Sequence, residues 1–276
     1  MGVRRAVELA CGELERDPKK RVFSLGPLIH NPQALNELKS RNLEITDEAE
    51  LPELFNNAAV IIRAHGVSPQ LEEELQGRGA HIIDATCPIV KASQLKAAAF
   101  TRAGYRLFLA GEESHAEISG ILGYCENVNI VEIVNSAFMA EKSAKNLFLK
   151  YPDAKTALIG QTTISAGEYE AIGKAISRYF QDLEIVQTIC SATKERQESL
   201  HELLGNVDAV IVTGGKESAN TRRLYDIAKA SGKPCVLVET AKDIPPEFFN
   251  FKIIGLTAGT STPDFVIEEI ERLLQN

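Results

Sequence analysis

No apolar run in the sequence approaches the roughly eighteen residues that a membrane-spanning helix needs, and residues 1–10 lack the apolar stretch of a signal peptide. We therefore expect a cytoplasmic protein with no membrane partner. Positive charge is also in deficit, because 30 lysines and arginines face 38 aspartates and glutamates and give a net charge of −8. This balance excludes a general attraction for nucleic acid, so a site for an anionic substrate has to be built locally.

Several short catalytic motifs are missing as well. The sequence has no Walker loop, no GxGxxG and no HExxH, which removes support for nucleotide-binding and zinc-protease functions. Its five cysteines are odd in number, widely spaced and never in a C-x-x-C pair, which argues against a disulfide framework and a local zinc site. A cysteine cluster would have to assemble in space from Cys11, Cys87, Cys125, Cys190 and Cys235.

What is present is the composition of a soluble globular protein, with 44% apolar and 25% charged residues. A β-rich apolar run, a turn of small or polar residues and a stretch of helical periodicity follow one another repeatedly. Nine such runs lie at residues 22–25, 60–63, 81–84, 106–110, 156–159, 184–189, 209–212, 235–238 and 252–256. Strands alternating with helices at this spacing predict right-handed crossovers and parallel sheets, so the fold class is α/β.

The nine units divide naturally by three, into domains of about ninety residues. We predict an α/β domain at 1–88, a second at 89–186, and a third at 187–276 with a C-terminal helix. Residues 2–11 read as an amphipathic helix that no strand precedes, unlike the other recurrent helices. We therefore expect that the chain as given starts inside its first unit, with the first strand missing.

Polar side chains follow most of the predicted strands at or just beyond their carboxyl ends. Parallel α/β sheets place their ligands at these ends, so these residues predict one shared site if the sheets face one another. The residues in question are His30, His65, Cys87, His115, Thr162, Cys190 and Ser261.

Two of the cysteines have the same context, a strand end followed by a predicted helix. Cys87 precedes Pro88, a residue suited to a first helical turn, and Cys190 precedes a helix predicted from Thr193 onward. The positive end of a helix dipole favours thiolate, which is the form that binds metal. The alternative is that each is a small buried apolar residue, which is what we expect for the other three cysteines.

Three of the five histidines, His30, His65 and His115, lie in loops at equivalent positions. Each could be an ordinary surface residue, but together they could neutralise a diphosphate or bind a metal. The turns at 214–220 and 257–263 offer backbone N–H groups and hydroxyls to a phosphate.

Seven strings of residues in this order and spacing resemble the 4-hydroxy-3-methylbut-2-enyl diphosphate reductase family, also called LytB or IspH. The resemblance covers essentially the whole chain. The strings are IRAHGV at 62–67, DATCP at 84–88, HAE at 115–117, QTT at 161–163, CSAT at 190–193 with Arg196-Gln197, SAN at 218–220 and AGTSTP at 258–263.

The resemblance implies three α/β domains in a trefoil arrangement around a central [4Fe–4S] cluster held by three cysteines. Cys87 and Cys190 match two of these metal ligands. The third belongs to a Gly-Phe-Cys-x-Gly-Val segment, of which the chain has only Met1-Gly2-Val3, so we expect that ligand one residue upstream of Met1. With only these two ligands, we expect the cluster to be incomplete or absent in the chain as given.

The resemblance also implies the roles of the remaining residues. Glu117 and Thr162 are the expected proton-relay pair, and an external donor such as ferredoxin or flavodoxin would supply two electrons through the cluster. The substrate would be an allylic diphosphate, dehydroxylated reductively to isopentenyl or dimethylallyl diphosphate. The expected substrate-binding residues are His30, His65, His115, Thr162, Ser218, Asn220 and Ser261.

Two positions depart from the common family pattern. Ala116 stands where proline is usual, and Ala219 stands where many members have a second serine. The second change removes a hydroxyl from the diphosphate pocket.

Two other functions remain open at this point. Cys87 or Cys190 could be a nucleophile with a loop histidine as its base, in an acyl or phosphoryl transferase. Alternatively, the chain could be a non-catalytic phosphate-binding relative that lacks a complete cluster.

Overall fold

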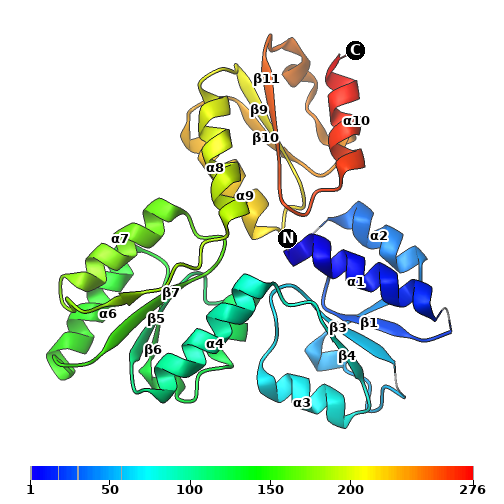
Figure 1. Cartoon of the computed structure of the whole chain (residues 1–276). Helices are drawn as coiled ribbons and strands as arrows, with labels where there is room; N and C mark the ends of the chain where they lie inside the picture. The colour runs from blue at the N-terminus through cyan, green and yellow to red at the C-terminus, as the bar shows by residue number, and fades with distance from the viewer. Residues whose placement is uncertain (1, 18, 30, 57, 276) are drawn as a thin grey trace.

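The computed structural model describes residues 2–17, 19–29, 31–56 and 58–275. Three lobes surround a centre at which the N-terminus lies, and the chain passes through them in order from blue to red (Figure 1). Each lobe contains one parallel β-sheet with helices packed against its faces.

The first sheet has the strand order β2-β1-β3-β4, and all of its paired strands are parallel. Its strands are β1 (Val22–Leu25), β2 (Leu43–Thr46), β3 (Ala59–Ile62) and β4 (His81–Asp84). The helices of this part of the chain are α1 (Gly2–Arg16), α2 (Pro32–Ser40) and α3 (Pro69–Gly77).

The second sheet repeats that arrangement in the order β6-β5-β7-β8. Its strands are β5 (Arg106–Ala110), β6 (Val131–Val134), β7 (Thr156–Gly160) and β8 (Glu184–Ile185). The helices along this stretch are α4 (Pro88–Arg102), α5 (Ala116–Leu122), α6 (Ala137–Lys150) and α7 (Ala166–Ser177).

The third sheet has the order β10-β9-β11. Its strands are β9 (Ala209–Thr213), β10 (Cys235–Val238) and β11 (Ile254–Ala258). The accompanying helices are α8 (Ser191–Leu204), α9 (Ala219–Ala230) and α10 (Asp264–Gln275).

In all three sheets, the strand that comes first in the sequence lies between the second and the third. The chain leaves the first and the third strand toward opposite faces of such a sheet, and ligands bind in the crevice between these two strands. The loops after β1 and β3, after β5 and β7, and after β9 and β11 are thus the positions at which the fold offers a site.

Two helices carry the chain from one lobe to the next. α4 follows β4 of the first sheet but packs against β5 and β7, and α8 follows β8 of the second sheet but packs against β11 and α9. α1 packs against β1 and β3, so α1, α4 and α8 hold equivalent places and begin near the centre (Figure 1). Cys87 and Cys190 stand immediately before α4 and α8.

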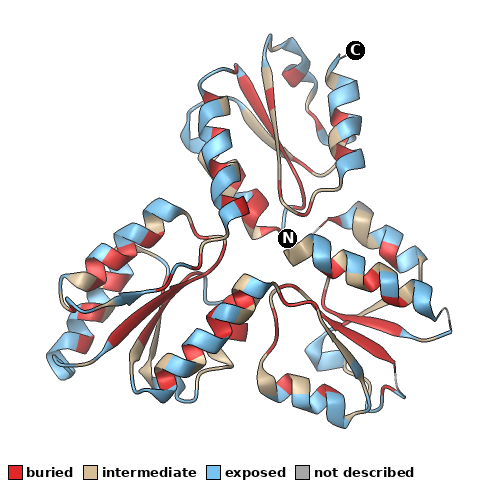
Figure 2. Cartoon of the chain, in the orientation of Figure 1, coloured by how far each residue is buried: buried red, intermediate tan, exposed pale blue. Residues whose placement is uncertain are grey.

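Apolar packing on both faces of each sheet stabilises the lobes. The central strands have no exposed residue, as in β3, where all four residues are buried, and Figure 2 shows this burial running through the sheets. Near-continuous apolar runs of this kind are expected where helices cover both faces of a parallel sheet. At about 25 cal/mol per Å² of buried apolar surface, this packing is the main stabilising contribution.

The predicted α/β class and parallel sheets are confirmed, with three small domains. Three details differ from the prediction. β2 and β6 were missed, β8 ends at Ile185 instead of residue 189, and β11 begins at Ile254 instead of residue 252. The domain limits near residues 88 and 186 stay a prediction. No helix in the described part of the chain has the length and apolar character to cross a membrane.

Candidate active site

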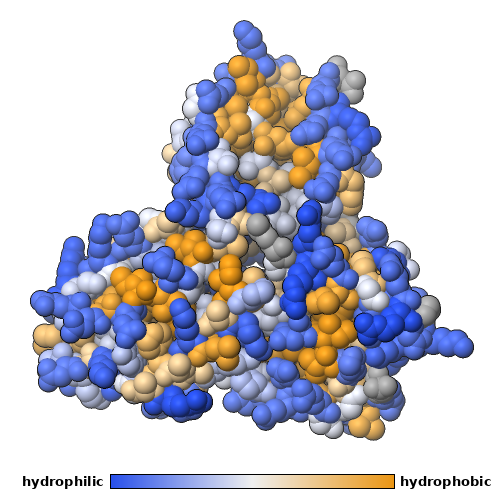
Figure 3. Space-filling model, in the orientation of Figure 1, coloured by the Kyte–Doolittle hydropathy of each residue, from blue (hydrophilic) through white to orange (hydrophobic). Residues whose placement is uncertain are grey.

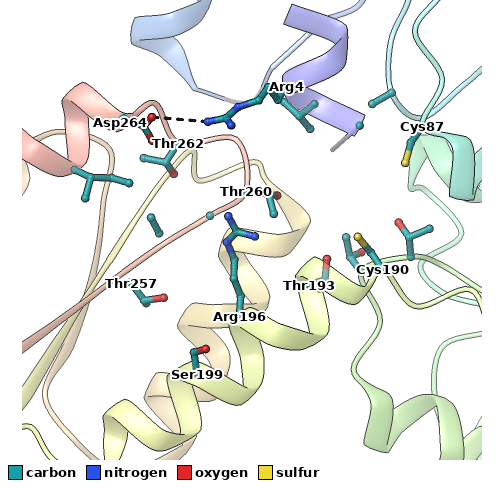
Figure 4. A pocket seen from close by; sticks show the side chains of 18 of the residues that line it. Arg4, Cys87, Cys190, Thr193, Arg196, Ser199, Thr257, Thr260, Thr262 and Asp264 are labelled. Atoms are coloured by element: carbon teal, nitrogen blue, oxygen red, sulfur yellow. Dashed lines mark ion pairs between the residues drawn. The ribbon is translucent and has the colours of Figure 1, made fainter.

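A cavity of about 540 Å³ lies between the lobes, and Figure 4 shows part of its wall. Each lobe contributes to it through strand-end loops and helix N-termini. From the predicted site, the residues that line it are His65, Cys87, Glu117, Thr162 and Cys190. The structure therefore brings the expected cysteines, the expected proton-relay pair and one histidine into a single space.

The two cysteines have matching surroundings. Each is the N-cap residue of its helix and makes no side-chain capping hydrogen bond, so the thiol is not used to end the helix. The Cys87 N–H donates to Ala64 O at 2.9 Å, and the Cys190 N–H donates to Thr162 O at 3.1 Å. Figure 4 shows both sulfurs facing the same space. Both thiols therefore lie at the N-terminus of a helix beside one cavity.

The start of α1 lies directly against Cys87. A Cβ atom added to Gly2 would come within 2.7 Å of Cys87 Cβ and 3.0 Å of its Sγ, so only glycine fits without a shift. Arg5 fixes this contact, since its Nη1 donates to Thr86 O at 3.1 Å. The N-terminal end of α1, at Gly2, therefore lies at the same centre as the two thiols.

Cys11 lies elsewhere. It is nine residues after Gly2 on the same helix, or about 14 Å along the axis, and its Sγ accepts a hydrogen bond from Arg41 Nη1 at 3.0 Å. The described residues contain no group of three His, Cys, Asp or Glu side chains arranged to hold a metal ion. The third expected thiolate is thus not among them, and its place upstream of Met1 stays a prediction.

The donors that are present suit an iron–sulfur cluster. Thiolates are the usual ligands of such clusters, and two thiols at helix N-termini face one cavity here. Cys87 and Cys190 therefore fit two ligand positions of a cluster at the centre.

Glu117 lies in the first turn of α5 and is only 1% exposed. The Thr162 N–H donates to its Oε1 at 2.7 Å, and the Thr162 hydroxyl donates to its Oε2 at 2.9 Å. Burial raises the pKa of Glu117 to about 7, although both hydrogen bonds from Thr162 lower it. A carboxyl with this pKa can hold a proton near neutral pH and release it to a substrate.

His115 precedes Glu117 and is oriented by it. His115 is the N-cap of α5, and its Nδ1 accepts a hydrogen bond from the Glu117 N–H at 3.2 Å. In the neutral ring the proton is then inferred to be on Nε2. The His65 and His115 rings meet edge to face at a centroid distance of 5.2 Å. The third predicted histidine, His30, lies outside the described residues.

The three predicted residues of the third lobe lie together but do not line the cavity. Ser218 is the N-cap residue of α9. The loop after β11 packs closely on the first turn of this helix, since a Cβ atom added to Gly259 would come within 2.1 Å of Thr221 Oγ1. Both polar side-chain atoms of Asn220 and the hydroxyl of Ser261 are buried without a hydrogen-bond partner. Unpaired buried polar groups are rare in native proteins, so this cluster is consistent with an anion-binding site.

Sequence reasoning missed one further polar group beside these residues. The Thr221 hydroxyl is also buried and unpartnered. Thr221 directly follows Asn220 of a quoted motif, and that adjacency was the available signal.

This fold and site define a class of protein: a three-lobed α/β protein in which two helix-cap cysteines and a buried glutamate–threonine pair line one cavity. The sequence matches the LytB protein family over residues 1–275, and the chain belongs to that family.

Relatives and solved structures agree with this assignment. The chain is 40% identical over 282 residues to a 4-hydroxy-3-methylbut-2-enyl diphosphate reductase of Treponema denticola, covering 99% of this chain and 94% of the relative. It is 38% identical over 275 residues to a reductase of the same name from Aquifex aeolicus, covering 99% and 92%.

Two solved structures of reductases were also compared. The Plasmodium falciparum E-1-hydroxy-2-methyl-but-2-enyl-4-diphosphate reductase matches with a TM-score of 0.90 at 27% identity, covering 100% of this chain and 84% of that one. A second structure, described as (E)-4-hydroxy-3-methyl-but-2-enyl diphosphate reductase, the terminal enzyme of the non-mevalonate pathway, matches with a TM-score of 0.70 at 37% identity, covering 100% and 95%.

Proposed function

We propose that this protein reduces (E)-4-hydroxy-3-methylbut-2-enyl diphosphate to isopentenyl and dimethylallyl diphosphate, the last reaction of the non-mevalonate route to isoprenoids. The observation that carries the proposal is that Cys87, Cys190 and the Glu117–Thr162 pair line one cavity in a member of the LytB family. The relatives' names favour this reductase over a cysteine-dependent transferase.

Cys87 and Cys190 are the proposed ligands of a [4Fe–4S] cluster. When bound, such a cluster would pass two electrons from an external carrier to the substrate and would offer a Lewis-acidic iron to the departing hydroxyl group. The third proposed ligand is the position immediately before residue 1. Support comes from the equivalence of the three central helices, since cysteine precedes both α4 and α8, and Gly2 of α1 abuts Cys87.

Glu117 is the proposed proton source. Its carboxyl is held by Thr162 on the wall of the cavity, and its raised pKa keeps a proton available near neutral pH. The departing hydroxyl needs such a proton to leave as water. Thr162 positions the carboxyl through both of its oxygens, so the pair acts as one unit.

The diphosphate is the proposed ligand of the histidines and of the third-lobe cluster. His65 and His115 offer ring nitrogens from two lobes, and Ser218, Asn220 and Ser261 offer neutral polar groups from the third. His30 is proposed as a further histidine of this set. The electron donor is proposed to be an external carrier such as ferredoxin or flavodoxin.

Anaerobic iron and sulfide analysis, combined with an assay for the two products, tests this function. The protein should be assayed after reconstitution with iron and sulfide, with and without a cysteine placed immediately before residue 1. We expect bound iron to rise toward four per chain, and product to form, when that cysteine is present. A protein that turned substrate over without iron would instead support the transferase.

A further inference from the structure

Arg196 faces the central cavity from α8, the helix that begins after Cys190. It belongs to a stripe at three-residue spacing, and the residues of this stripe that line the cavity are Thr193, Arg196 and Ser199. Figure 4 shows its guanidinium group directed away from the helix axis toward the β11 loop at Thr260. Thr260 is the neighbour of Ser261, which belongs to the proposed diphosphate site.

The charge of Arg196 is not neutralised by any described carboxylate. Its one side-chain hydrogen bond in the described chain is from Nη1 to Ala192 O of its own helix, at 3.4 Å. The carboxylates that line the cavity are Glu117, Asp264 and Glu271, and none of them forms an ion pair with Arg196. The cavity's other arginine, Arg4, is 3.8 Å from Asp264 across the opening, as the dashed line in Figure 4 shows.

The other groups proposed to bind the diphosphate carry no permanent positive charge. Serine and asparagine are neutral, and an ordinary histidine is mostly neutral at pH 7. A diphosphate, in contrast, brings more than one negative charge into a chain whose own net charge is −8. An arginine holds its charge at every physiological pH and offers paired N–H donors that match phosphate oxygens.

We propose that Arg196 is a further substrate-binding residue, which contacts the diphosphate from the third lobe and supplies positive charge that the neutral groups lack. The inference rests on the proposed function, because it takes an allylic diphosphate as the ligand. Arg196 would then also select the substrate, because its charge favours anionic substrates over uncharged allylic alcohols of the same carbon skeleton.

Calorimetric titration with inorganic diphosphate tests this role. Arg196→Gln should weaken diphosphate binding by about tenfold or more, and should flatten the dependence of Kd on salt concentration. Arg196→Lys, which keeps the charge but loses the paired donors, should fall between Arg196→Gln and the parent. The matched control is Lys194→Gln, because Lys194 carries the same charge on the same helix but is 58% exposed and pairs with Glu198. Its Kd should equal that of the parent.

The outcomes separate this inference from the proposed function. If the parent binds diphosphate and Arg196→Gln binds it equally well with the same salt dependence, Arg196 has no such role and the proposed reaction is unaffected. If the parent protein itself fails to bind diphosphate, the anion site is wrong and the role of Arg196 falls with it. Equal melting temperatures for the parent and the variants establish that the changes concern binding and not folding.

Discussion

The Glu117 carboxylate accepts two hydrogen bonds from Thr162, one from the main-chain N–H at 2.7 Å and one from the hydroxyl at 2.9 Å. Thr162 in turn accepts at its carbonyl oxygen the N–H of Cys190 at 3.1 Å. The proposed proton source and a proposed cluster ligand are therefore fixed by the same residue. Thr162 therefore fixes the position of Glu117 relative to Cys190, although these two residues begin helices of different lobes.

Replacing Glu117 by glutamine should abolish most turnover while leaving the site assembled. The amide oxygen can still accept from Thr162, but the side chain has no acidic proton, and general acids contribute typically about 10²–10⁴-fold. We expect a loss of that size in product formation, with unchanged iron content and unchanged affinity for inorganic diphosphate. The control is Glu113→Gln, because Glu113 is exposed and lies in the segment just before α5. Turnover at the parent rate would show that another group donates the proton.

The same substitution should change how stability depends on pH. Because burial raises the pKa of Glu117 to about 7 in the folded protein, the native state holds this proton more tightly than the unfolded chain does. Its contribution to stability is therefore full below the unfolded pKa and is lost as pH rises through about 7, by an amount on the order of 3 kcal/mol.

Glutamine carries no such proton, so Glu117→Gln should gain stability relative to the parent as pH rises from about 5 to about 8. Melting temperatures measured at both pH values check this. A difference between parent and variant that is the same at both would contradict the raised pKa.

The β11 loop should tolerate alanine at residue 259 only if residue 221 is also changed. A Cβ there would lie 2.1 Å from Thr221 Oγ1, so Gly259→Ala should destabilise the protein by about 1–3 kcal/mol and weaken diphosphate binding. Adding Thr221→Ala removes the clashing hydroxyl, so the double variant should recover stability. The measurement is a double-mutant cycle in denaturant. Additive effects of the two changes would mean that the contact is not the cause.

The cysteines should separate into two groups by their effect on bound iron. Cys87→Ser and Cys190→Ser should each lower the iron retained after anaerobic reconstitution, because each removes a sulfur ligand from the wall of the cavity. Cys11→Ser should leave iron content unchanged, since Cys11 pairs with Arg41 farther along α1. Loss of iron in Cys11→Ser instead would make Cys11 the third ligand.

The sequence predicted the class of fold and the positions of His65, Cys87 and Thr162 just after strands, because both depend on local patterns. β2 and β6 were missed because each carries a glutamate, Glu44 or Glu132, that interrupts the apolar run of a strand at a sheet edge. β8 was overextended because residues 186–189 continue the strand-like composition, although the ladder with β7 ends at Ile185.

The contacts between the candidate site residues could not be predicted from the sequence. No sequence spacing shows that Thr162 binds both oxygens of Glu117, because 45 residues and two sheet strands separate them. The contact of Gly2 with Cys87 likewise joins segments that only the packing of α1 on the first sheet brings together. Long-range contacts of this kind come from the tertiary fold.

The most direct test of the account is product formation from (E)-4-hydroxy-3-methylbut-2-enyl diphosphate by the anaerobically reconstituted protein, with a cysteine immediately before residue 1 and a chemical reductant as electron source. The account predicts isopentenyl and dimethylallyl diphosphate as products, formed by the parent and lost in both Cys190→Ser and Glu117→Gln. A protein that binds four irons and the diphosphate substrate yet forms neither product would contradict it.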